Sequence, residues 1–271
     1  MHRGGSSAGL RGGKPKGIIR AILTAMPASR KVKTRPARAK TSAPKAVHAK
    51  PKAKLSRKDY TSPARLAKIF EALDQLFPRA ECALRHDNAF QLLVATILSA
   101  QCTDERVNRV TPGLFAKYPT PQDFAALNPE VLQVEIRSTG FFRNKAKSII
   151  GAAKKLVADF KGEVPQSMEE LLTLPGVARK TANVVLGTAY GIPSGVVVDT
   201  HVSRIVGRLK LSTEKTPERI EQDLMKIVPR EHWISFAHQV IWFGRKICQA
   251  RKPLCASCPI ENLCDSRDKT V

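Results

Sequence analysis

Apolar residues recur every three or four positions along most of the chain from residue 62 onward. After Ser62-Pro63, a pair typical of a helix start, they fall at Leu66, Ile69, Phe70, Leu73 and Phe77. The next set is Phe90, Leu93, Val94, Ile97 and Leu98. This spacing puts each set on one helix face, and the same pattern predicts helices over 104–117, 129–137, 143–160, 217–228 and 232–247.

No segment alternates apolar and polar residues as a half-buried strand would. Val196-Val197-Val198 is short and runs directly into a helix start. Ser167-Met168-Glu169-Glu170 has the pattern of a capping box, which predicts another short helix. The sequence therefore predicts an all-α fold with short connections.

The first 58 residues have a different composition, rich in Lys, Arg, Ala, Pro, Gly and Ser. Residues 1–60 hold 17 of the 46 Lys and Arg and only one acid, Asp59. Such a segment buries too little apolar surface to fold, so we interpret 1–60 as a disordered basic tail. It is similar to tails that coat DNA; an organelle transit peptide and translation from Met26 are the alternatives.

The net charge is +23, and no stretch approaches the roughly 18 apolar residues of a membrane span. These features exclude an integral membrane protein and point to a polyanionic partner, with nucleic acid as the first expectation. A ribosomal-type or merely basic protein is the alternative, and charge alone does not separate them.

A predicted hairpin of helices lies at 171–182, where a short helix, the turn Pro175-Gly176 and a second helix follow one another. Apolar residues form one stripe on the second helix, and Lys180, Asn183 and Gly187 are predicted on the opposite side. Unpaired backbone N–H groups at such a helix start suit a phosphate. An ordinary helix–turn–helix with an exposed lysine is the alternative.

Asp199 stands at a second helix start, where Asp is a preferred N-cap. A lysine amine is a nucleophile, and a nearby carboxylate can accept its proton. Lys180 and Asp199 together therefore suggest an amine-nucleophile site on DNA, and this role is compatible with capping.

Four of the six cysteines fall within 17 residues, as Cys248-x6-Cys255-x2-Cys258-x5-Cys264. Four thiolates can hold a [4Fe–4S] cluster or a zinc ion. Zinc sites commonly use two separated Cys-x2-Cys pairs, and this run has one, so its spacing favours the cluster. Cys82 and Cys102 are predicted to be small buried apolar residues.

These motifs together resemble the endonuclease III family, bifunctional DNA glycosylase/AP lyases of the helix-hairpin-helix superfamily. The matching segments are Leu98 to Asp104, Leu174 to Asn183, Val198 to His201 and the cysteine run, so that the resemblance spans roughly 62–266. It implies that Lys180 attacks the sugar C1′, that Asp199 assists, and that the four cysteines hold a [4Fe–4S] cluster. One departure is Ala178, where the family usually has a second hairpin glycine; Ala is small and keeps its N–H, so we expect phosphate binding to survive.

The resemblance also implies DNA contacts. Gln101 enters the space left by the extruded nucleotide, and Phe141 aligns with an apolar wedge, although core packing is its alternative. His201 is placed near the DNA backbone, or is simply structural. The other predicted contacts are Leu174, Gly176 and Ala178 in the hairpin, and Arg251 and Lys252, which are otherwise solvated surface bases.

The resemblance predicts two helical lobes flanking a DNA-binding cleft: a hairpin domain over 82–193, and a cluster domain built from 61–81 and 194–271. The predicted function is removal of oxidised pyrimidines from duplex DNA, followed by β-elimination through a lysine Schiff base. The partner is double-stranded DNA with damaged bases or abasic sites. We expect a monomer in the bacterial cytoplasm or nucleoid, or in an organelle or nucleus of a eukaryote.

Two other classes stay open. Monofunctional adenine or thymine mismatch glycosylases share the hairpin and cysteines but lack a lysine at position 180. The adenine type also has an extra C-terminal domain, which we do not expect because the chain ends seven residues after Cys264. A non-enzymatic DNA-binding protein would have no need for Lys180 and Asp199 together.

Overall fold

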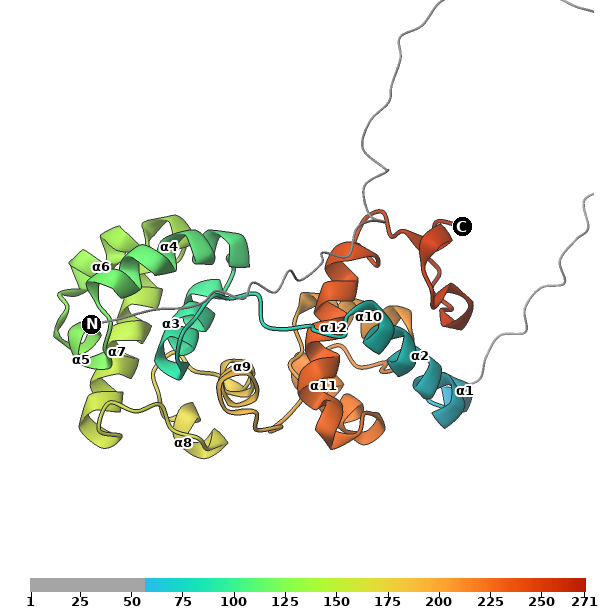
Figure 1. Ribbon diagram of the computed structural model, residues 1–271, viewed down its shortest axis with the longest axis horizontal. Helices are drawn as coiled ribbons and strands as arrows, with labels where there is room; N and C mark the ends of the chain where they lie inside the picture. The colour runs from blue at the N-terminus through green and yellow to red at the C-terminus, as the bar shows by residue number, and fades with distance from the viewer. Residues whose placement is uncertain (1–56) are drawn as a thin grey trace, which may run out of the picture. The chain divides into compact units, whose positions relative to one another are not determined.

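The computed structural model describes residues 57–271, and within that range every regular element is helical (Figure 1). The all-α prediction is confirmed. The α-helices are α1 (Arg57–Tyr60), α2 (Pro63–Leu76), α3 (Ala89–Ser99), α4 (Asp104–Lys117), α5 (Pro121–Ala126), α6 (Pro129–Glu135), α7 (Phe142–Asp159), α8 (Met168–Leu172), α9 (Arg179–Tyr190), α10 (Thr200–Arg208), α11 (Pro217–Ile227) and α12 (Trp233–Lys246). Two 3₁₀ turns lie between α-helices, η1 (Arg137–Thr139) and η2 (Arg230–His232), and two follow α12, η3 (Cys255–Ser257) and η4 (Glu261–Leu263).

One hydrophobic core is formed by α3 to α9, with α3 at its centre. Helix α3 is apolar on nearly every side, and Phe90 to Leu98 are all buried, so neighbouring helices can pack around it. Phe124 of α5 is fully buried and packs edge-on against Phe90, with ring centroids 5.3 Å apart. Helix α5 was absent from the predicted elements, since a six-residue helix offers too few positions for a periodic pattern.

A second core joins α2 to α10, α11 and α12, and so brings together the two ends of the described chain. Ile69 and Leu73 of α2 are at most 1% exposed. Arg65 is buried beside them, and its guanidinium donates to the backbone carbonyls of Leu209 at 2.9 Å and Leu263 at 2.6 Å. These two separate cores agree with the expected pair of lobes. The exact domain boundaries stay a prediction.

The predicted tail lies outside the described residues, except for its last four. Residues 57–60 form α1, so the prediction that the tail extends to residue 60 is wrong at this boundary. The reason is Tyr60, which is buried and whose hydroxyl bonds the carboxylate of Asp265 and accepts from Lys210 Nζ at 2.8 Å.

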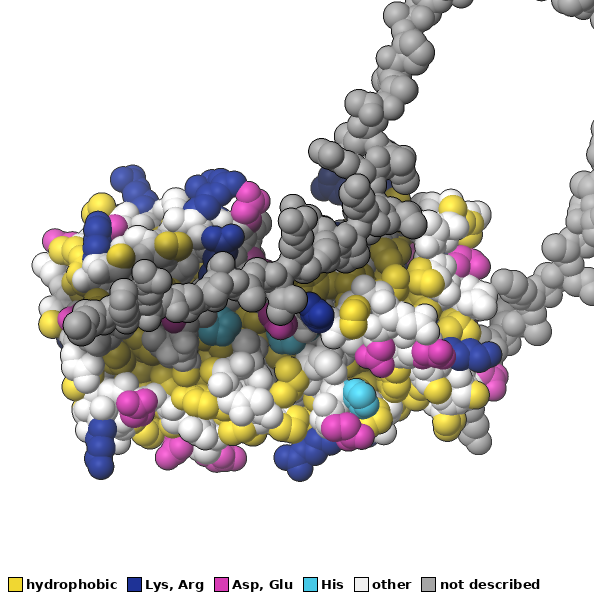
Figure 2. All heavy atoms as spheres, in the orientation of Figure 1, with side chains coloured by type: hydrophobic (Ala, Val, Ile, Leu, Met, Phe, Trp, Pro, Cys, Tyr) yellow, Lys and Arg dark blue, Asp and Glu magenta, His cyan; other side chains and the backbone are white. Residues whose placement is uncertain are grey.

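Acidic and basic side chains are both present on the face of residues 57–271 drawn in Figure 2. This mixture matches the sequence count, since residues 61–271 hold 29 bases and 22 acids. No helix in the described part of the chain is long and apolar enough to cross a membrane.

Candidate active site and cysteine pocket

The hairpin is built by α8, the turn 173–178 and α9. Ser167 caps α8, accepting from the Glu170 N–H at 3.2 Å, as predicted; its hydroxyl also donates to the Glu170 carboxylate at 2.8 Å. Leu174 is 2% exposed and anchors the turn in the first core. Its N–H donates to the Leu171 carbonyl and its carbonyl accepts from the Val177 N–H, so the predicted DNA contact of Leu174 stays a prediction.

Gly176 at the tip of this turn cannot be replaced without strain. Its φ is +78°, and a Cβ at this position would lie 2.4 Å from the Ser148 Cβ of α7. Ala178, in contrast, has φ −99°, a conformation that any residue adopts. The alanine in place of the family's second glycine therefore costs no backbone strain.

Helix α9 begins at this turn with its first amide groups uncovered. Its N-cap is Ala178, whose side chain cannot accept a hydrogen bond, whereas side chains cap α3, α4, α5, α6, α8 and α10. The first N–H groups of a helix have no intrahelical partner and carry positive potential. Lys180 lies exposed in the same turn. The arrangement places an amine beside donors that suit a phosphate.

Asp199 is the N-cap of α10, as predicted. Its Oδ1 accepts from the Val202 N–H at 2.8 Å, and the side chain is half-buried. The preceding Val196 and Val198 are buried in the second core and fix the approach of the chain. The other carboxylate oxygen makes no hydrogen bond to any described residue, so it is free to act on a ligand.

His201 follows in the first turn of α10 and is half-buried. Its Nδ1 accepts from Arg204 Nη2 at 3.2 Å, because an arginine can only donate. Burial lowers the pKa of His201, an effect that the nearby Asp199 carboxylate opposes. The predicted contact with the DNA backbone stays a prediction.

A buried carboxylate ties α9 to α11. Glu221 is 5% exposed and accepts from Arg179 Nε at 2.9 Å, Arg179 Nη2 at 3.1 Å and Asn183 Nδ2 at 2.8 Å. The hydrogen bond to Glu221 raises the pKa of Arg179. Gly195 passes so close that a Cβ there would lie 2.0 Å from Glu221 Oε1. The residue before Lys180 is therefore fixed to the lobe that carries Asp199.

This contact also involves Asn183, which the sequence predicts on the Lys180 side of α9, opposite the apolar stripe. Asn183 is 3% exposed, because its side chain packs against Glu221 and Ser194. Sequence reasoning missed Glu221 altogether. Its one signal is its spacing: Glu221 stands three, four and seven residues before Leu224, Met225 and Val228, which puts it on the apolar face of the predicted helix over 217–228.

Glu221→Ala should lower the free energy of unfolding by about 1–3 kcal/mol, since Arg179 and Asn183 lose a charged, buried partner. The Arg179 side chain is 43% exposed, so water replaces part of the interaction that its guanidinium loses. Urea unfolding followed by circular dichroism measures the change. Glu218→Ala, an exposed glutamate on the same helix, is the control and should stay within about 0.5 kcal/mol. Equal stability of the two variants would show that the Glu221 contact contributes nothing.

Gln101 and Phe141 occupy two loops and share an unusual backbone conformation. Gln101, between α3 and α4, has φ +53°, and Phe141, just before α7, has φ +46°. Residues other than glycine rarely adopt this region, and such strain concentrates at functional sites. Phe141 is 67% exposed, so its alternative interpretation as a core side chain is wrong.

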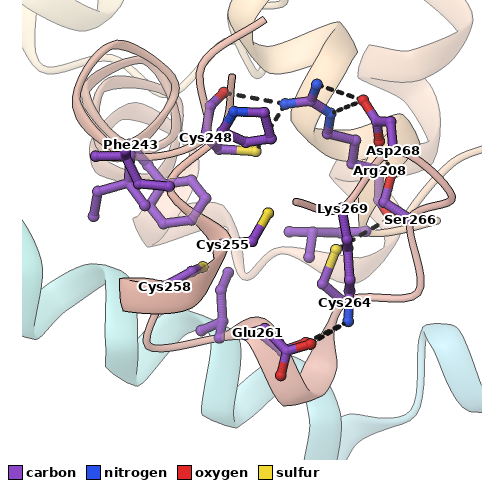
Figure 3. Close-up of a pocket in the computed structure, with 15 residues that line it drawn as sticks. Arg208, Phe243, Cys248, Cys255, Cys258, Glu261, Cys264, Ser266, Asp268 and Lys269 are labelled. Atoms are coloured by element: carbon purple, nitrogen blue, oxygen red, sulfur yellow. Dashed lines mark hydrogen bonds and ion pairs between the residues drawn. The ribbon is translucent and has the colours of Figure 1, made fainter. Parts of the chain in front are cut away.

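The four clustered cysteines line one pocket (Figure 3). Phe243, Ile247, Leu254 and Ile260 supply apolar walls around about 430 Å³ of space, part of which opens to solvent. All four thiols are free and half-buried, and burial raises the pKa of Cys258 and Cys264. Arg208 Nη1 donates to Cys248 Sγ at 3.2 Å.

The donor set of this pocket is chemically suited to an iron–sulfur cluster. Four sulfurs surround a common apolar space, and thiolates are the ligands of iron–sulfur clusters. Among residues 57–271, no three His, Cys, Asp or Glu side chains come close enough to hold a single metal ion. Arg251 and Lys252 are exposed on the loop between the first two cysteines. Cys82 and Cys102 lie elsewhere, partly buried against the first core.

Comparison with known proteins gives consistent matches. Residues 94–230 match the model of the HhH-GPD superfamily of base excision DNA repair proteins. Endonuclease III of Synechocystis sp. is 55% identical over 212 residues, which cover 78% of this chain and 97% of the relative.

Two solved structures align over 78% of this chain with 44% identity and a TM-score of 0.72. One is a non-covalent endonuclease III–DNA complex, of which 96% is covered. The other is a trapped endonuclease III–DNA covalent intermediate, the estranged-adenine complex, of which 97% is covered.

Proposed function

Because the chain belongs to the endonuclease III family, within the HhH-GPD superfamily, we propose that Lys180 is the nucleophile of its reaction. The protein is a base excision DNA glycosylase and AP lyase that binds damaged duplex DNA. The observation that carries the role of Lys180 is its position. It lies exposed in the uncapped first turn of α9, directly after the hairpin turn.

The proposed substrate is an oxidised pyrimidine in duplex DNA, extruded so that the enzyme can reach its glycosidic bond. The neutral Lys180 amine attacks the sugar C1′, the base leaves, and a Schiff base forms. The imine acidifies the C2′ hydrogen, and β-elimination then breaks the strand 3′ to the lesion. Asp199 accepts the lysine proton and opposes the positive charge that develops on the sugar.

We infer that the DNA backbone is held at the hairpin. The Gly176 turn permits close approach, and the free amides at Ala178 and the start of α9 can donate to a phosphate. Gln101 fills the space left by the extruded nucleotide and Phe141 wedges the duplex. Their exposure and strained backbone support these roles. In this proposal His201 lies near the DNA backbone.

Cys248, Cys255, Cys258 and Cys264 would hold a [4Fe–4S] cluster. When bound, such a cluster supplies structural cross-linking of the loop. Arg251 and Lys252 on that loop then contact DNA phosphates. We also propose two lobes with boundaries near residues 82 and 193, which the two separate cores support. The proposed location is the bacterial nucleoid, which the bacterial relative supports.

A duplex with one oxidised pyrimidine tests this function directly. Incubation with borohydride should trap a covalent complex and release the base, while an undamaged duplex should give neither. Base release without trapping would instead indicate a monofunctional glycosylase. Binding without either product would contradict the proposed chemistry.

Asp199→Asn should slow base removal by more than tenfold, within the range of general acid–base groups. The amide oxygen of Asn can still accept from the Val202 N–H, so the helix cap is kept while the charge is lost. Single-turnover rates on the lesion duplex measure the effect, with Asp59→Asn, an exposed aspartate of α1, as the control. An unchanged rate would leave Asp199 with capping alone.

A further inference from the structure

Lys145, in the first turn of α7, is a buried cation with main-chain partners. It is 4% exposed, and its ammonium donates to the Leu98 carbonyl and the Thr139 carbonyl, both at 2.8 Å. Within the described chain it forms no ion pair with an acid. Burial lowers the pKa of Lys145. A charge is costly to bury, so a buried ammonium without a carboxylate calls for an explanation.

The two carbonyls belong to different elements, each of which leads into one of the two loops. Leu98 is near the end of α3, three residues before Gln101, and Thr139 ends η1, two residues before Phe141. The two acceptors are 41 residues apart in sequence, and Lys145 is the side chain that bonds both. Its backbone N–H also donates to the Phe141 carbonyl at 3.1 Å. Lys145 therefore joins the bases of the two strained loops.

The strain of these loops explains why they need such a link. Gln101 and Phe141 each hold a left-handed conformation that persists only where the surroundings impose it. Thr139 is itself 2% exposed and donates its hydroxyl to the Ile136 carbonyl at 2.8 Å, so that side of the link is fixed. Hydrogen bonds from a charged donor are stronger than those between neutral groups. An ammonium, with three donors, can hold two carbonyls at once.

We propose that Lys145 is a positioning residue that holds the Gln101 and Phe141 loops as one unit, so that both side chains enter the duplex together when a nucleotide is extruded. This rests on the proposed function, in which Gln101 and Phe141 enter the DNA. Lys145 is almost wholly covered, so it acts through the two loops and does not touch the reacting atoms.

The test compares two substrates for Lys145→Met, a change that keeps side-chain length and removes the donors. On an oxidised pyrimidine in a fully paired duplex, base removal should fall at least tenfold. On a duplex with a preformed abasic site, strand cleavage needs no base extrusion and should fall less than threefold. Borohydride trapping at the abasic site counts active molecules, so partial misfolding is corrected. Lys154→Met, an exposed lysine of the same helix, should change neither rate.

A double-mutant comparison separates positioning from a general structural role. In a Gln101→Ala, Phe141→Ala background, adding Lys145→Met should reduce paired-duplex activity by less than twofold further, because the loops have nothing left to position. Lys145→Arg keeps donors for both carbonyls, so it should recover at least half of the lost rate. If Lys145→Met fails to fold, Lys145→Gln, which is neutral and one atom shorter, replaces it and should show the same difference between the two substrates.

An equal loss on both substrates, or the same tenfold loss in the doubly substituted background, would overturn the proposal for Lys145. The proposed function is tested separately. If Gln101→Ala, Phe141→Ala alone leaves base removal unchanged, these two side chains do not enter the duplex, whatever Lys145 does.

Discussion

Lys180→Gln should abolish the borohydride-trapped complex and lower base removal by at least about 10³-fold, since loss of a nucleophile removes the covalent route. Glutamine is similar in length and cannot form a Schiff base. Because Lys180 is exposed and makes no hydrogen bond or ion pair with another described residue, its loss should leave the fold intact. Gel separation of trapped complexes gives the yield, and single-turnover kinetics give the rate.

Binding is the control for this variant. Fluorescence anisotropy on an abasic-site analogue should give a dissociation constant within about threefold of wild type. The reason is that one positive charge near a phosphate contributes only a small part of the free energy of DNA binding. Lys154→Gln, an exposed lysine of α7, should retain full trapping. Trapping of Lys180→Gln at wild-type yield would remove Lys180 from the mechanism and direct the search to another amine.

Cys258→Ser should reduce soluble yield severalfold and weaken DNA binding, since the loop of Arg251 and Lys252 loses an anchor. Anaerobically purified wild-type protein should be brown and contain about four irons per chain, and the variant should contain far less. Iron and acid-labile sulfide analysis measures this independently of enzyme activity. Cys82→Ala, outside the cysteine pocket, should keep both colour and iron.

One zinc and no iron in native protein would overturn the cluster and leave the pocket as a zinc site. Full soluble yield and DNA affinity in Cys258→Ser would contradict its structural role. Metal analysis tests which metal the pocket binds, and the yield and DNA affinity of Cys258→Ser test whether the pocket anchors the loop. Either prediction can therefore be contradicted without the other.

The helices and the hairpin could be predicted because their signals are local. Periodic apolar residues identify α3 and α7, and Ser167 and Asp199 are N-cap residues at the positions where the structure has them. The cysteines could also be grouped, since they are close together in sequence. A local pattern is thus enough to predict those parts of the candidate site in which residues that contact each other are also close in sequence.

Lys145 and Glu221 could not be predicted because their partners are distant. Lys145 bonds a carbonyl 47 residues earlier, and Glu221 bonds a guanidinium 42 residues earlier. A charged residue on a helix is ordinarily solvated, so nothing in the local pattern singles out either residue. The burial of Asn183 could not be predicted for the same reason: the periodicity of α9 locates its apolar stripe but not the second lobe that covers its polar side.

The discontinuous second core has a consequence during synthesis on the ribosome. Helix α2 belongs to the same core as residues such as Val202, which is translated 133 residues after Ile69. At a translation rate of about 5–20 residues per second, the apolar face of α2 stays without these packing partners for about 7–27 s. The first core, in contrast, is contiguous from Leu84 to Leu186 and can form while synthesis continues. A nascent chain stalled near residue 193 would therefore expose α2 to chaperones and to aggregation, even with its first lobe complete.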